Sequence, residues 1–166
     1  MIKDSKENKN NRLKRSITST IKALANNPKI EIIFGKNSNK KENILLPEIE
    51  KTLDKKSIDS IRGIGDSEAL VRKYHNKYIH NKYTPKDASN KSIYDSLEHL
   101  RCELIGSKSM LGVEKNLNSY LETKYKKAGY NKNSKKTDVP VLEALKVLIK
   151  QNSFSSNLPK QAKFVL

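Results

Sequence analysis

The sequence predicts a mainly helical (α+β) domain of about five helices with one small β-hairpin near its N-terminus. Two observations lead to this prediction. Apolar residues recur at spacings of three and four along most of the chain, which is the period of an α-helix, whereas alternation typical of strands is confined to residues 30–46. The 166 residues, of which 35% are hydrophobic, suffice for one domain with a modest core.

The N-terminal part is expected to begin with a disordered basic tail over residues 1–11, which has almost nothing to bury. Apolar residues then recur every three or four positions from Leu13 to Leu24 and predict a helix. Residues 26–28 (Asn-Asn-Pro) should end it.

Two short strands follow this helix. Residues 30–34 alternate in the manner of a strand, residues 35–43 form a polar loop, and residues 44–46 are a second apolar run ended by Pro47. We expect the two strands to pair as a hairpin. Because a two-stranded ribbon is marginally stable alone, it should lie against helices.

The middle of the chain predicts two helices separated by a loop. Residues 55–74 have one apolar helical face, and Gly63 and Gly65 within it indicate a close approach to another helix. Residues 75–87 are expected to be a loop. Residues 89–105 form a stronger amphipathic helix, with Gly106 at its C-terminal cap.

The last third predicts two further helices and a short terminal one. A helix from Met110 ends near Ala128, with Gly129 as its cap. A basic loop over residues 130–137 leads to a helix opened by Asp138 and Pro140. Its expected buried face consists of Leu142, Leu145, Leu148 and Ile149. A short helix over residues 159–166 is expected last.

The charge is strongly positive, with 34 basic and 18 acidic residues giving a net charge of +16. The basic residues are mostly lysine and are spread evenly, which is typical of a solvated surface but also compatible with an anionic partner. Lysines and tyrosines interleave over residues 124–136, so one function that stays open is a small nucleic-acid-binding module using Lys124–Lys136. The alternative is an exposed helix end, where lysines also suit the helix dipole.

The distribution of apolar residues along the sequence excludes two classes of protein, those that span a membrane and those with a secretory signal. No apolar run is long enough to span a membrane, and the Lys/Asn-rich N-terminus does not have the apolar core of a secretory signal. Cys102 is the single cysteine, so we expect a reducing, cytoplasmic setting.

Candidate reactive residues are few. His75, His80, His99 and Cys102 could form a metal cluster, but their spacing does not require one, and the simpler interpretation is that the histidines bond to loop backbone. Cys102 is interpreted as a small, partly buried apolar residue. No phosphate-binding loop is present, and we predict no catalytic, cofactor-binding or metal residues in this chain. Glu98 and Arg101 are three apart on a helix and should pair.

Two stretches carry a resemblance to a known family. The first is RGIGDSEAL, which begins at Arg62, and the second is EHLRCELIGSKSMLGVEKNL, which runs from Glu98 to Leu117. With RLKRSITSTIKALANNPKIEIIF and LLPEI before them, residues 12–166 resemble the N-terminal domain of the CobT-type subunit of the aerobic, ATP-dependent cobaltochelatase. Set against the family's pattern, the sequence ends at Leu166 before that domain would finish, without the acidic linker and von Willebrand A-type domain. We therefore expect either a fragment of a longer protein or a relative truncated at its C-terminus.

The resemblance implies a function and partners. The family's enzyme, a metal–nitrogen bond-forming ligase, inserts cobalt into hydrogenobyrinic acid a,c-diamide during aerobic cobalamin biosynthesis. A large subunit binds the corrinoid and an AAA+ subunit hydrolyses ATP, so ATP, Mg²⁺ and Co²⁺ belong to the complex and this chain itself holds no cofactor.

The resemblance also assigns the chain a non-catalytic assembly role within an oligomer. The residues that match the family's pattern and are expected to form or shape the subunit interface are Arg62, Asp66, Arg101, Glu103, Ser107 and Met110.

Overall fold

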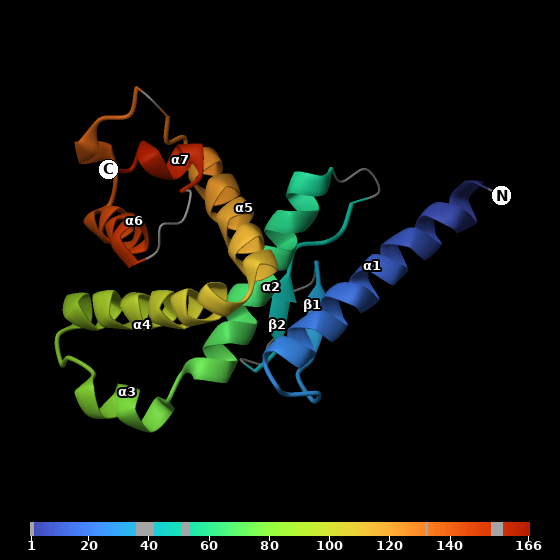
Figure 1. Cartoon of the computed structure of the whole chain (residues 1–166), viewed down its shortest axis with the longest axis horizontal. Helices are drawn as coiled ribbons and strands as arrows, with labels where there is room; N and C mark the ends of the chain where they lie inside the picture. Colours follow the sequence, from blue (N-terminus) through green and yellow to red (C-terminus); the bar gives the residue numbers. More distant parts are fainter. Residues whose placement is uncertain (1, 36–41, 51–53, 132, 154–157) are drawn as a thin grey trace.

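The computed structural model describes residues 2–35, 42–50, 54–131, 133–153 and 158–166. In these ranges the chain is mainly helical, which confirms the predicted class (Figure 1). The elements in chain order are α1 (Ile2–Leu24), β1 (Ile32–Phe34), β2 (Ile44–Leu46), α2 (Lys55–Tyr74), α3 (Lys77–Tyr83), α4 (Ala88–Ser109), α5 (Leu111–Lys127), the 3₁₀ helix η1 (Lys136–Asp138), α6 (Val141–Ser153) and α7 (Lys160–Lys163).

Helix α1 ends at Leu24, as predicted, but it begins at Ile2. The expectation of a disordered tail over residues 1–11 therefore does not match this helix. These residues include neither proline nor glycine, so a helix that is packed from Leu13 onward can propagate backward through them. In Figure 1 this part of α1 extends away from the rest of the molecule.

The two predicted strands pair with each other, but they run parallel, so the predicted hairpin is wrong. Their register places Ile32 opposite Ile44 and Phe34 opposite Leu46. A hairpin turns the chain within a few residues, whereas residues 35–43 are enough to return it to the starting end of so short a strand. Ile44 and Leu46 are buried and Leu45 is exposed, so one face of the sheet joins the core.

The main core lies between α1, the sheet, α2 and α5, and it is centred on Ile21, Ile44 and Leu70. Both glycines of α2 make the predicted close approaches. A Cβ on Gly63 would collide with the backbone oxygen of Asn116 in α5, and one on Gly65 would lie 2.5 Å from Cδ1 of Ile21 in α1. Helix α2 therefore packs closely against α5 at Gly63 and against α1 at Gly65.

Two predictions about the middle of the chain are wrong. Residues 75–87 contain helix α3, whose first turn is capped by the side chain of Asn76 accepting from the Ile79 amide. Gly106 lies inside α4 rather than beyond its end. A Cβ at this position would collide with the side chain of Leu70. The glycine serves helix packing rather than termination.

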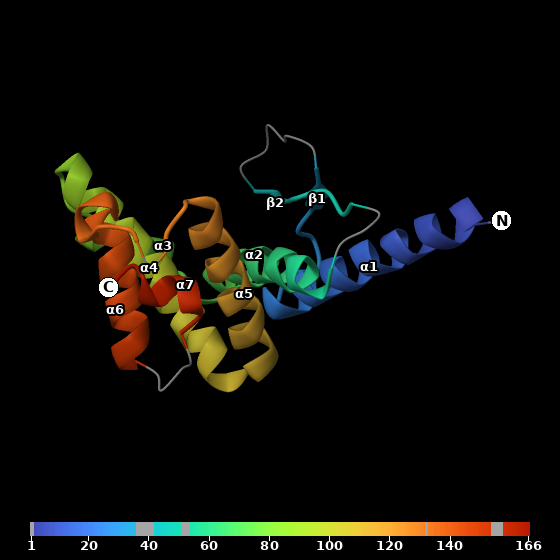
Figure 2. The same cartoon turned by 90° about the horizontal axis from the view of Figure 1, so that it is seen from above.

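A second, smaller core joins α5, α6 and α7 around Tyr125 and Val147. Figures 1 and 2 both place α6 and α7 at the end of the molecule opposite the N-terminus. The buried residue of α6 is Val147, and Leu148 is 47% exposed, so the expected buried face of this helix is shifted. Asp138 belongs to η1, and the carbonyl of Pro140 instead accepts the first amide bonds of α6.

Gly129 ends α5 with a φ of +80°, as predicted for a helix cap. Among the described residues, none of the helices combines the length and the apolar character that crossing a membrane requires.

Candidate functional site

The polar side chains of α4 form two networks, one directed inward and one at the surface. The inner network centres on Glu103, whose side chain is 14% exposed. Ser67 of α2 donates its hydroxyl to Glu103 Oε1 at 2.6 Å, and Nζ of Lys150 in α6 lies 3.1 Å from Oε2. One carboxylate thus joins three helices.

Burial works to raise the pKa of Glu103, but Lys150 and the Ser67 hydrogen bond outweigh it and hold that pKa below its usual range. The carboxylate is therefore ionised at neutral pH inside a largely buried setting. A charge of this kind depends on its partners, because an unpaired buried ion is strongly destabilising.

Ser67, His99 and Glu103 include the residue types of a hydrolytic triad, but the hydrogen bonds are those of a structural network. The Ser67 hydroxyl has one proton and donates it to Glu103, so His99 Nε2, 2.8 Å from Ser67 Oγ, must be the donor to that oxygen. A ring nitrogen that carries a proton cannot accept one from serine. This arrangement does not activate Ser67 as a nucleophile.

The inner network lines a cavity of about 180 Å³ between α2, α4, α5 and α6. Pockets that hold drug-sized ligands measure about 300–1,000 Å³. This cavity is consequently too small for a corrin macrocycle, and its charged walls serve helix packing.

The outer network confirms the predicted pair of Glu98 and Arg101. Arg101 Nε donates to Glu98 Oε2 at 2.7 Å, and its Nη2 donates to the carbonyl of Tyr74 at 2.9 Å. The hydrogen bond from Arg101 and that from His75 lower the pKa of Glu98 to about 2. Arg101 thereby ties α4 to the last turn of α2.

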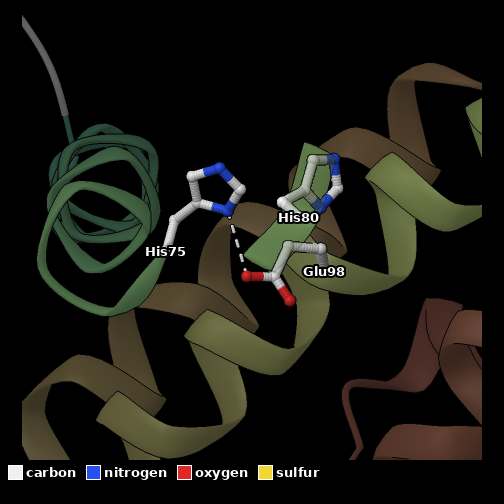
Figure 3. A group of neighbouring side chains, drawn as sticks. All are labelled: His75, His80 and Glu98. Carbon is white, nitrogen blue, oxygen red and sulfur yellow. Dashed lines mark hydrogen bonds and ion pairs between the residues drawn. The ribbon is translucent and has the colours of Figure 1, made fainter. Parts of the chain in front are cut away.

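The cysteine and the three histidines do not form one group in the structure. Cys102 is fully buried, and burial raises the pKa of its thiol to about 11, which agrees with its interpretation as a small apolar residue. His75 and His80 lie together with Glu98 (Figure 3), whereas His99 belongs to the inner network. The four-residue cluster considered from the sequence is not formed.

Asp66 is buried in α2 and is 2% exposed, and it accepts a hydrogen bond of 2.8 Å from Asn116 Nδ2 in α5. Burial raises the pKa of Asp66 to about 6, although Asn116 and Arg62 act to lower it. Arg62 itself is more exposed and lies 3.9 Å from Asp59 Oδ1.

We expect the raised pKa of Asp66 to make the chain less stable as pH rises from 4 to 6. The folded state binds the Asp66 proton more tightly than the unfolded state, so this stabilisation is complete below pH 4 and is lost as pH rises through 6, at a total cost of roughly 3 kcal/mol. The Asp66→Asn variant should not show this loss. Urea unfolding of both proteins at several pH values measures this difference. If the free energy of unfolding changed with pH in the same way for both, the raised pKa of Asp66 would be contradicted.

The six predicted interface residues do not form one patch. Arg62 and Arg101 present exposed side chains, whereas Asp66 and Glu103 lie inside. Ser107 donates to the carbonyl of Leu104 at 3.2 Å. Met110 lies at the junction of α4 and α5 and packs on the main core.

Sequence reasoning missed Lys150 as the partner of Glu103. Lys150 lies 47 positions from Glu103, and no local pattern joins them. The spacing of four between His99 and Glu103 was the signal that could have pointed to the inner network.

Some side chains of the lysine-rich stretch Lys124–Lys136 make contacts within the fold. Lys124 lies 2.7 Å from Glu143 Oε1, and Tyr125 is fully buried and donates its hydroxyl to Glu143 Oε2. Tyr125 therefore has no free face on which a base could stack. Lys132 lies outside the described residues, as does the side chain of Lys136.

A family model described as cobalamin biosynthesis protein CobT matches residues 7–166. No solved structure matches the chain at a significant level.

Proposed function

Because the chain belongs to the family of the cobalamin biosynthesis protein CobT, we propose that it is a non-catalytic assembly domain of a multi-subunit cobaltochelatase. Membership implies a role in cobalamin biosynthesis. The single observation that carries the proposal is the match over residues 7–166, which is almost the whole chain.

The polar side chains of this domain hold its helices together, which supports an assembly role rather than a catalytic one. Glu103, Arg101 and Asp66 each join one helix to another, and the serine and cysteine within these networks are not activated. The chemistry of cobalt insertion would then take place on a large corrinoid-binding subunit, with ATP hydrolysis on an AAA+ subunit. ATP, Mg²⁺ and Co²⁺ would be needed by that complex.

A groove between α4 and α6 is the surface we assign to the partner. It is lined mainly by aliphatic side chains, with Arg101 and Lys108 also contributing. The aliphatic residues are Leu97, Leu100, Leu104, Ile105 and Ile149. Ile105 is 39% exposed, so it is available as an anchor for an apolar segment of the AAA+ subunit.

Replacing Ile105 with lysine should weaken binding of the AAA+ subunit in the presence of ATP by tenfold or more, because an anchor side chain is removed and a charge faces an apolar partner. Leu111→Lys is the matched control, since Leu111 is 83% exposed and does not line the groove. Biolayer interferometry on both variants, with circular dichroism to verify folding, tests the assignment. Equal binding by the two variants would overturn it.

A further inference from the structure

His75, His80 and Glu98 meet where α2 ends, α3 begins and α4 passes beneath them (Figure 3). Each offers one ligand atom, and these atoms all lie within 4.8 Å of one another. The side chains are 25%, 14% and 18% exposed, so the group is partly shielded while still open to solvent. Two imidazoles and a carboxylate are a common ligand set for a divalent transition metal.

His80 has a free ligand atom in a fixed orientation. Its Nε2 lies 2.8 Å from Asp95 Oδ1, and its ring stacks on Tyr94 with centroids 4.5 Å apart. A carboxylate at Nε2 keeps the proton on that nitrogen and leaves the lone pair on Nδ1. Nδ1 is buried and has no hydrogen-bond partner among the residues that the structure describes.

This pattern of hydrogen bonds is the one that metal-binding histidines adopt. A metal-bound ring nitrogen is usually backed by a carboxylate, carbonyl or water on the other nitrogen. A buried lone pair that faces no donor is unfavourable by itself, and a cation would satisfy it. The Asp95–His80 pair thus indicates a ligand on the Nδ1 side.

His75 and Glu98 provide the second and third ligands. His75 Nδ1 lies 3.0 Å from Glu98 Oε1. Two atoms that each lie about 2.1 Å from a tetrahedral metal are about 3.4 Å apart, so a metal could replace the shared proton with little movement. Arg101 holds Oε2 through Nε and also reaches Oε1 through Nη2 at 2.8 Å. The Nη2 bond is the one that a metal would displace.

We propose that His75, His80 and Glu98 bind a divalent transition cation of the Zn²⁺ or Co²⁺ type, with water completing its coordination. Imidazole ligands favour such ions over Mg²⁺ and Ca²⁺, which prefer oxygen ligands. The residue set differs from the one considered from the sequence, because Glu98 replaces His99 and Cys102. The proposal is independent of the assembly function, since it concerns only residues within this chain.

Isothermal titration of the purified chain with ZnCl₂ or CoCl₂, in a buffer that does not bind metals, tests the site. We expect one ion per chain, no comparable binding of Mg²⁺, and a Tm that rises with Zn²⁺. His80→Ala should lower the Zn²⁺ affinity about 100-fold or more. His99→Ala is the matched control, because His99 lies on α4 outside the group, and it should bind as the unaltered chain does.

Asp95→Asn is the second variant and leaves all three ligands in place. Asp95 has a 47% exposed side chain, so this change should not disturb folding, yet it should lower the Zn²⁺ affinity about 10- to 100-fold by removing the carboxylate behind His80. The proposal is overturned if the chain binds no Zn²⁺ or Co²⁺, if Mg²⁺ binds equally well, or if Asp95→Asn and His80→Ala bind Zn²⁺ like the His99→Ala control.

Discussion

Replacing Gly63 with alanine will lower the free energy of unfolding by about 3 kcal/mol. The added methyl group would collide with the backbone oxygen of Asn116, and a backbone atom cannot turn aside as the end of a side chain can. Helices α2 and α5 would have to separate at the contact that organises the main core. Since small domains are stable by only about 5–15 kcal/mol, a loss of this size is easily measured by urea unfolding.

Gly112→Ala is the control for this prediction. Gly112 also lies in a helix, but a Cβ there would meet no atom within 4 Å. Alanine should therefore leave stability unchanged or raise it by up to about 1 kcal/mol, through its higher helix propensity. If both variants lost the same stability, the close packing at Gly63 would not be the cause.

Replacing Lys150 with methionine will lower the free energy of unfolding by about 3–5 kcal/mol, because it leaves the Glu103 carboxylate buried without its nearest cation. The folded state would also lose the low pKa of Glu103. In the unaltered chain, the low pKa of Glu103 contributes stability at pH values above the usual pKa of glutamate, and this stability is lost as the pH falls. The stability of Lys150→Met should therefore depend less on pH below about 4.5.

Two further variants isolate the effect of charge. Lys150→Met combined with Glu103→Gln should be less unstable than the sum of the single changes, because the unpaired charge is gone. Lys56→Met breaks the more exposed pair with Glu122 and should cost less than about 1 kcal/mol. Equal losses for Lys150→Met and Lys56→Met would show that the inner network does not hold the three helices together.

Helical periodicity predicted most of the fold, because each long helix buries one face. Helix α2 begins and ends as predicted, with Asp54 capping its first turn and the approaches at Gly63 and Gly65 confirmed. The direction of strand pairing was not predictable. Strands of three residues carry no pattern that distinguishes parallel from antiparallel partners.

In the candidate sites, contacts within one helix could be predicted from the sequence, whereas contacts between helices could not. The pair of Glu98 and Arg101 was predictable because both residues lie one turn apart on a single helix. The two closest partners of Glu103, Ser67 and Lys150, and the partner of His75 come from other helices. Helix α3, which positions His80, has no buried residue that would produce an apolar period. Short capped helices of this kind are decided by turn chemistry and by packing on neighbours.

The association of the chain with other subunits tests the central proposal most directly. Light scattering after gel filtration would measure the mass of the chain alone, and then with the AAA+ subunit of a cobaltochelatase and ATP, at moderate salt. The account predicts a shared peak of high mass that needs ATP and persists at about 0.2 M salt, because apolar contacts in the α4–α6 groove are not screened. Two separate peaks, each with the mass of the isolated component, would contradict it.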